Sequence, residues 1–90
     1  GGPTAPETHV SKILIAEDDT AVRKFVSRAL VNAGHNVTAA ADGGQALETL
    51  ENDTFELLLS DIVMPELDGI ALALKVSRDW PDMPILLMTG

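Results

Sequence analysis

Short apolar runs alternate regularly with longer stretches of helical periodicity, and this alternation restricts the fold more than any other feature of the sequence. Four runs are expected as strands: 13–16, 36–40, 55–60 and 85–88. Between them, apolar residues recur every three or four positions over 20–33, over a shorter stretch that begins at Asp42 and ends at Glu51, and over 70–80. The predicted order of elements is therefore β-α-β-α-β-α-β.

Two of these strands are apolar at nearly every position, which indicates a sheet with both faces covered. The runs are Ile13–Ala16 and Leu57–Leu59. Right-handed crossovers between such strands give a parallel sheet with helices on both faces. We therefore predict an α/β fold with a doubly wound parallel sheet. In sheets of this kind, ligands bind at the carboxyl ends of the strands, near the point where the strand order reverses.

Length and charge narrow the class of protein. The 90 residues, 46% of them hydrophobic, are enough for one small domain, which we expect to run from 12 to 90 after a tag or flexible segment at 1–11. A net charge of −8 argues against binding to nucleic acid. The apolar runs are far shorter than the roughly 20 residues that cross a bilayer, so we expect no membrane span. The sequence has no Cys, which is compatible with a cytoplasmic location.

Carboxylates follow two of the predicted strands. Glu17 and Asp18 come directly after the first strand, Asp61 follows the third, and Thr89 follows the fourth. Parallel strands bring these residues to one edge of the sheet, where clustered carboxylates stay ionised mainly if they share a cation or are separated by water. Mg²⁺ prefers oxygen ligands and commonly uses one or two carboxylates. The sequence therefore predicts a magnesium site that includes Asp18 and Asp61.

Each acid also has a common structural role. The run Glu17-Asp18-Asp19 is typical of the acidic start of a helix, and we expect Asp19 and Thr20 to serve there. Asp61 alone is typical of a turn at the end of a strand. Only the combination of two strands that both end in acids favours a metal site over these structural roles.

Four segments closely resemble the receiver domain of bacterial two-component response regulators. They are residues 13–19 (ILIAEDD), 58–65 (LLSDIVMP), 68–69 (DG) and 87–90 (LMTG), in the order and spacing of that family. The resemblance extends from Lys12 to Gly90. It implies the flavodoxin-like fold of CheY, a standard example of the strand order 2-1-3-4-5. The last helix, strand and helix of that fold are missing from this sequence.

The resemblance also implies roles for individual residues. Asp61 would accept a phosphoryl group from a phosphohistidine, carried by a histidine kinase or a histidine phosphotransfer protein. Asp18 would bind Mg²⁺ directly, Glu17 would bind it through a water, and the main-chain carbonyl of Val63 would complete the protein ligands. Thr89 would be the switch hydroxyl that turns toward the phosphoryl oxygens. The implied output is a change in which protein is bound, not the turnover of a substrate.

One residue of the family pattern has no counterpart. Receivers use a Lys at the end of a fifth strand, and Lys12, Lys24 and Lys75 do not lie at a matching position. Without that cation the phosphoryl group loses a charge-assisted contact, so a phosphorylation-independent pseudo-receiver is an alternative. A magnesium phosphatase with an Asp nucleophile is a weaker alternative, because it needs a second acid two residues after Asp61, where Val63 stands.

Two finer expectations concern partners. Segments 68–76 and 86–90 are most similar to the CpdR-type single-domain regulators, which implies a role in regulated proteolysis with a ClpXP-type protease as the downstream partner. The fourth strand would lie at the edge of the sheet with only apolar side chains. Since such an edge invites pairing with another chain, we predict a homodimer through this strand.

Overall fold

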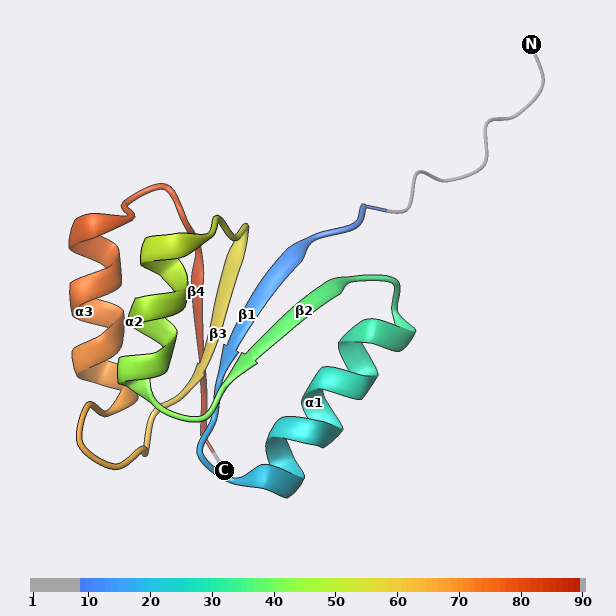
Figure 1. The fold of residues 1–90 in the computed structure, drawn as a ribbon, viewed down its shortest axis with the longest axis horizontal. Helices are drawn as coiled ribbons and strands as arrows, with labels where there is room; N and C mark the ends of the chain where they lie inside the picture. Colours follow the sequence, from blue (N-terminus) through green and yellow to red (C-terminus); the bar gives the residue numbers. More distant parts are fainter. Residues whose placement is uncertain (1–8, 90) are drawn as a thin grey trace, which may run out of the picture.

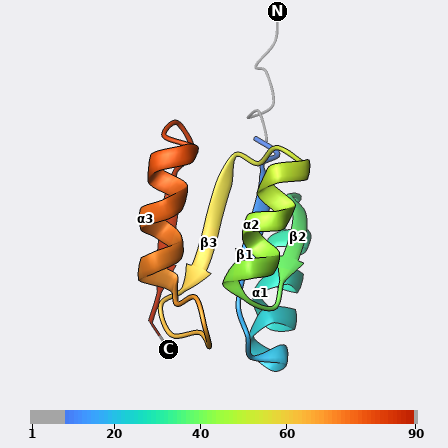
Figure 2. The ribbon, with the colours of Figure 1, turned by 60° about the vertical axis from the view of Figure 1, so that its left-hand side comes forward.

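The computed structural model describes residues 9–89, which form one parallel sheet with helices on both faces. The elements are β1 Lys12–Ala16, α1 Thr20–Asn32, β2 Asn36–Ala40, α2 Gly43–Asn52, β3 Leu57–Asp61, α3 Gly69–Asp79 and β4 Ile85–Met88. The strand order is β2-β1-β3-β4. Figures 1 and 2 show α1 on one face of the sheet and α2 and α3 together on the other. The predicted fold class and order of elements are confirmed.

The third strand differs from its prediction at both ends. It begins at Leu57 instead of Phe55, because Phe55 packs against the edge of the core before the strand starts. It ends one residue later than predicted, at Asp61, which pairs in register with Met88. The backbone N–H of Ile62 then donates to the carbonyl of Met88 at 3.1 Å. Asp61 is therefore held in the sheet ladder and does not begin a loop.

Each of the three helices begins after an aspartate that caps it. The caps are Asp19, Asp42 and Asp68, whose side chains accept hydrogen bonds from the backbone N–H groups of Val22, Gln45 and Ala71. A cap of this kind contributes about 1 kcal/mol to helix stability. The caps fix where the chain leaves each strand and enters the next helix. Glu17 and Asp18, which precede the Asp19 cap, are therefore not needed to cap the helix.

The core lies between the sheet and the α2–α3 layer. Leu14 and Leu58 of the sheet are completely buried, as are Leu72 and Val76 of α3. Trp80 packs at the edge of this core. Parallel strands need cover on both faces, and these contacts cover one face of β1 and β3.

Helix α1 is amphipathic, but none of its residues is buried. The apolar stripe of the helix includes Phe25, which is 75% exposed, and Val22, which is 43% exposed. Val26 and Leu30 are half-buried. The helix packs mainly against β1 and β2, so it covers only part of its face of the sheet.

The described chain ends just after β4, which forms one edge of the sheet. Of the predicted N-terminal segment 1–11, residues 1–8 lie outside the described residues, while Ser11 is bonded to His35 through its backbone N–H. None of the helices within residues 9–89 has the length and apolar character that crossing a membrane requires.

Candidate metal and phosphoacceptor site

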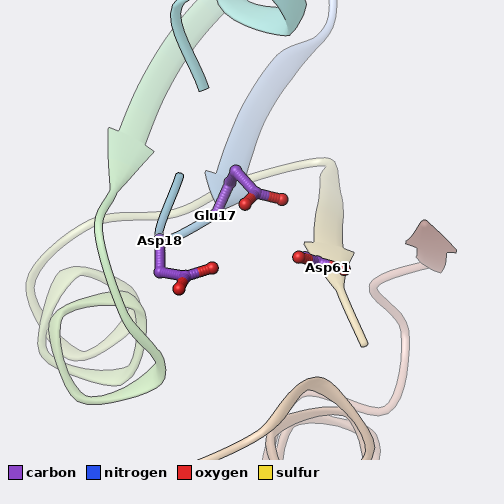
Figure 3. Close-up of side chains that lie close together, drawn as sticks. All are labelled: Glu17, Asp18 and Asp61. Atoms are coloured by element: carbon purple, nitrogen blue, oxygen red, sulfur yellow. The ribbon is translucent and has the colours of Figure 1, made fainter. Parts of the chain in front are cut away.

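Three carboxylates converge at the carboxyl ends of the neighbouring strands β1 and β3, as Figure 3 shows. One oxygen each of Glu17, Asp18 and Asp61 lies within 4.8 Å of the other two. The register explains this convergence. Ala16 of β1 is paired with Ser60 of β3, so the acids that follow both residues leave the sheet at the same level.

Glu17 is an acid in a buried position, with only 3% of its surface exposed. Its Oε1 accepts a hydrogen bond from the N–H of Asp19 at 2.9 Å, and its own N–H donates to the carbonyl of Ala40 at 3.1 Å. Burial raises the pKa of the Glu17 carboxyl, and the nearby Asp61 and Asp18 carboxylates raise it further, while the Asp19 N–H opposes the shift. A cation at this site would offset the cost of ionising Glu17.

The backbone of Asp61 packs against Gly69, the first residue of α3. Its Oδ1 accepts a hydrogen bond from the N–H of Val63 at 3.3 Å. The N–H of Gly69 donates to the carbonyl of Ile62 at 2.8 Å. A Cβ atom placed on Gly69 would lie 1.9 Å from the main-chain oxygen of Asp61. The residue that begins α3 must therefore be glycine if Asp61 is to stay in this position.

The loop between β3 and α3 is also held on its other side. A Cβ atom on Gly43, at the start of α2, would lie 2.7 Å from the main-chain oxygen of Leu67 in this loop. Met64 is buried beneath the loop, and Glu66 turns the chain with a φ of 65°. The loop that carries Val63 is thus packed between α2 and α3, beside the carboxylates.

A hollow of about 440 Å³ joins all of the predicted site residues. It is lined by Glu17, Asp18, Asp19, Val22, Asp61, Val63, Met88 and Thr89. Thr89 and Asp18 are exposed, and Asp61 is half-buried. No Lys or Arg from the described part of the chain lines this hollow. Lys12 lies at the start of β1, at the opposite end of the strand.

Arg23 also lies in the site region, although the sequence pattern did not predict a role for it. Its Nη1 donates to the main-chain oxygen of Glu17 at 2.8 Å and to that of Asp18 at 3.3 Å. Its guanidinium therefore ties the first turn of α1 to the two acids after β1. The sequence shows only a single Arg one helical turn after the acidic run. Periodicity alone does not distinguish such an Arg from a solvated surface residue.

The donor set fits a hard divalent cation. All three side chains offer carboxylate oxygens, with no nitrogen or sulfur among them, and burial raises the pKa of one of them, Glu17. Oxygen ligands of this kind suit Mg²⁺ and Ca²⁺ more than Zn²⁺ or copper. The cluster therefore can hold a metal such as Mg²⁺.

The chain is similar to several curated regulatory proteins. The response regulator receiver protein CpdR of Brucella abortus (strain 2308) is 47% identical over 81 residues, which are 90% of this chain and 68% of CpdR. The DNA-binding transcriptional regulator NtrC of Escherichia coli (strain K12) is 38% identical over 78 residues, which are 87% of this chain but 17% of NtrC. The chain thus spans about two thirds of the one relative and a small part of the other.

Solved structures agree with this relationship. The chemotaxis response regulator CheY4 of Vibrio cholerae has a TM-score of 0.82 at 32% identity, with 88% of this chain and 68% of CheY4 covered. TrrA of Thermotoga maritima, solved in complex with Mg²⁺ and BeF, has a TM-score of 0.86 at 26% identity, with 89% and 70% covered. The profile of the family described as "Response regulator receiver domain" matches residues 13–90. The fold, the acidic edge of the sheet and these matches together show that the chain belongs to the receiver domain family of two-component response regulators.

Proposed function

We propose that this receiver domain accepts a phosphoryl group on Asp61 in the presence of Mg²⁺ and thereby changes which protein it binds. The observation that carries the proposal is the convergence of Glu17, Asp18 and Asp61 in one hollow with Thr89. The structural similarity to TrrA, whose structure contains Mg²⁺ and BeF, supports the same use of this site.

Each residue of the site would have a separate role. Asp18 and Asp61 hold Mg²⁺ directly, the buried Glu17 holds it through a water, and the carbonyl of Val63 supplies a further oxygen. When bound, the metal neutralises charge on the transferred phosphoryl group. Thr89 lines the hollow from the end of β4, where its hydroxyl serves as the switch that donates to a phosphoryl oxygen.

The transfer itself needs one bond to form and one to break. A carboxylate oxygen of Asp61 forms a bond to phosphorus while the bond between phosphorus and the donor's imidazole nitrogen breaks. The electron pair of that bond returns to the imidazole. Asp61 suits this role because the sheet ladder and Gly69 fix its backbone while its side chain stays half-exposed.

The phosphohistidine donor, a histidine kinase or a histidine phosphotransfer protein, has an open approach beside α1. Val22 lines the hollow and is 43% exposed, and Phe25, one turn further along α1, is 75% exposed. Apolar side chains exposed next to a reactive site are typical of a surface that a partner covers. This surface supports a donor that docks over the first two turns of α1.

The identity with CpdR supports a finer assignment of the output. As the resemblance to CpdR-type regulators implies, phosphorylation of the domain controls regulated proteolysis through a ClpXP-type protease, and we place the domain in the cytoplasm. The protein acts as a phosphoacceptor and not as an enzyme that turns over a separate substrate.

The edge of the sheet supports self-association. β4 consists of four apolar residues, Ile85–Met88, and within the described residues it pairs only with β3. Leu86 is 56% exposed and Leu87 is 40% exposed. An uncharged apolar edge strand is a template for pairing with another strand, which favours a homodimer through β4.

Phosphoramidate, which carries phosphorus bonded to nitrogen as phosphohistidine does, tests the central step. Incubation with phosphoramidate and Mg²⁺ should add the mass of one phosphoryl group to the protein, and peptide mapping after borohydride reduction should place it on Asp61. The Asp61→Asn variant should gain no mass, whereas Asp42→Asn, which alters a helix cap away from the site, should gain it normally. No added mass on the wild-type protein, or equal mass on Asp61→Asn, would contradict the proposal.

A further inference from the structure

A second pocket lies at the opposite end of the sheet from the carboxylate site. Its residues come from the end of α2, the segment before β3, and the turn between α3 and β4. In Figure 1 these three segments meet at the top of the molecule, where β3 and β4 begin, while the strands run downward to the acidic edge. A ligand in this pocket would leave the phosphoacceptor site uncovered.

The floor of the pocket is apolar. Leu50 of the core, Phe55, Trp80, Pro81 and Met83 line it, and its volume is about 370 Å³. Small-molecule and side-chain pockets in proteins commonly have volumes of about 300–1,000 Å³ with mostly apolar walls. The pocket is therefore large enough for an aliphatic or aromatic side chain together with part of a neighbouring residue.

The rim of the pocket is acidic. Asp53, Glu56, Asp79 and Asp82 line it, and no Lys or Arg does. Asp53 is paired with Lys12, and Asp79 is paired with Lys75 and Arg78. Within the described residues, Glu56 has an ion-pair contact only with His9, and Asp82 has none. Two carboxylates thus remain at the mouth of an apolar pocket without a Lys or Arg partner.

Lys12 shows how this rim holds a cation. Its ammonium group lies 5.1 Å from the centroid of the Phe55 ring and also binds the carboxylate of Asp53. An aromatic ring and a carboxylate also occur together among the lining residues of the pocket as Trp80 and Asp82. Cations are attracted to such a pair by the ring quadrupole and by the opposite charge.

We propose that this pocket, defined by its floor of Leu50, Phe55, Trp80 and Met83 and its rim of Glu56 and Asp82, binds a short segment of a partner protein that places one apolar side chain next to Lys or Arg. The apolar side chain fills the floor, and the cation lies between the Trp80 ring and the carboxylates of Glu56 and Asp82. Charge complementarity selects this occupant, because the protein carries a net charge of −8 and an acidic segment would be repelled. The site works independently of Asp61 and needs no metal.

Trp80 makes the test direct, since it is the only Trp in the chain. The probe is the peptide acetyl-Lys-Leu-Arg-amide, titrated into the protein in the absence of Mg²⁺ while Trp80 emission and backbone amide NMR shifts are recorded. We expect a saturable change, with the shifted amides confined to 50–56 and 79–83. The peptides acetyl-Lys-Ser-Arg-amide, which lacks the apolar side chain, and acetyl-Glu-Leu-Glu-amide, which reverses the charge, should bind much more weakly.

Two variants with the same change of charge complete the design. Asp82→Lys alters the rim and should weaken binding of the probe by about fivefold, as expected for reversing one exposed charge. Glu51→Lys lies on the exposed surface of α2 outside the pocket and should leave binding within about twofold of the wild type. The proposal is overturned by the absence of saturation at millimolar peptide, by equal binding of the acidic peptide, or by equal effects of the two variants.

Discussion

At the scale of single residues, the site depends on two groups that do no chemistry. Gly69 allows the start of α3 to pack against the backbone of Asp61, and Arg23 ties α1 to the backbone of Glu17 and Asp18. Neither role was predictable from the sequence. A Gly after Asp68 reads as an ordinary helix start, and the close approach that requires it exists only in the folded chain. The acids themselves were predictable, because strand ends in a parallel sheet share an edge.

Gly69→Ala should therefore disturb both stability and the site. The added Cβ would meet the main-chain oxygen of Asp61 at 1.9 Å, so the backbone must move. We expect a loss of about 1–3 kcal/mol or more in the free energy of unfolding, the range for overpacking, measured by urea denaturation. The matched control is Gly44→Ala, whose Cβ would meet only the flexible side chain of Asp42, at 3.3 Å. Equal stability of the Gly69→Ala and Gly44→Ala variants would contradict this role.

At the scale of elements, periodicity predicted each helix and strand but not what covers it. The stripe on α1 is real, yet Phe25 is exposed because the helix packs mainly against β1 and β2. An apolar pattern shows which face of a helix is suited to burial and says nothing of how wide the partner surface is. β3 extends to Asp61 for a similar reason, since its pairing with Met88 on β4 is a contact between distant parts of the chain.

Helix α3 offers a test of which side of an element holds the fold together. Leu72 is completely buried beneath α3, whereas Leu74 on the same helix is 68% exposed. Leu72→Ala should lower the free energy of unfolding by about 2–5 kcal/mol, because it leaves a cavity in the core. Leu74→Ala should change it by no more than about 0.5 kcal/mol. Similar losses in the two variants, measured by urea denaturation, would show that the α2–α3 layer is not the main core.

The contact between β1 and the residue after α2 predicts a dependence on pH. A hydrogen bond and charge from Lys12 lower the pKa of the Asp53 carboxyl below its ordinary value of 3.8. The stabilisation is therefore fully present above that value and is lost as the pH falls through the lowered pKa of the folded state. As the pH falls from 3.8 through the lowered pKa of the folded state, the wild-type protein should lose more stability than the Asp53→Asn variant. Parallel losses in urea midpoints over this range would exclude a contribution from the pair.

At the scale of the whole molecule, the candidate metal site and the apolar edge strand occupy different parts of the sheet. The acidic edge lies at the carboxyl ends of the strands, and the uncharged strand β4 forms one side of the sheet. The alternation of elements predicted that the strand ends share one edge of the sheet, whereas the strand order was implied by the resemblance to CheY. The sequence could not predict the pocket lined by Trp80, which arises where the end of α2, the segment before β3 and the turn between α3 and β4 meet.

The edge strand predicts behaviour that depends on concentration. Light scattering should show the mass rising from monomer to dimer as the protein is concentrated, because pairing through β4 covers Leu86 and satisfies its free backbone groups. Leu86→Lys should remain monomeric, while Leu74→Lys, at a more exposed leucine on α3, should still dimerise. A monomeric mass of the wild-type protein at the highest concentration would rule out this interface.

The sharing of one metal ion by Glu17, Asp18 and Asp61 is tested most directly by a calorimetric titration of the protein with Mg²⁺, with and without beryllofluoride. We predict one Mg²⁺ per chain in the wild type, tighter binding when beryllofluoride is present, and a loss of at least about tenfold in Mg²⁺ affinity for Asp18→Asn and Asp61→Asn. Asp42→Asn, which removes a carboxylate outside the cluster, should bind Mg²⁺ as the wild type does. Equal Mg²⁺ affinity of the wild type and Asp61→Asn would show that Glu17, Asp18 and Asp61 do not share an ion, and the account would fail.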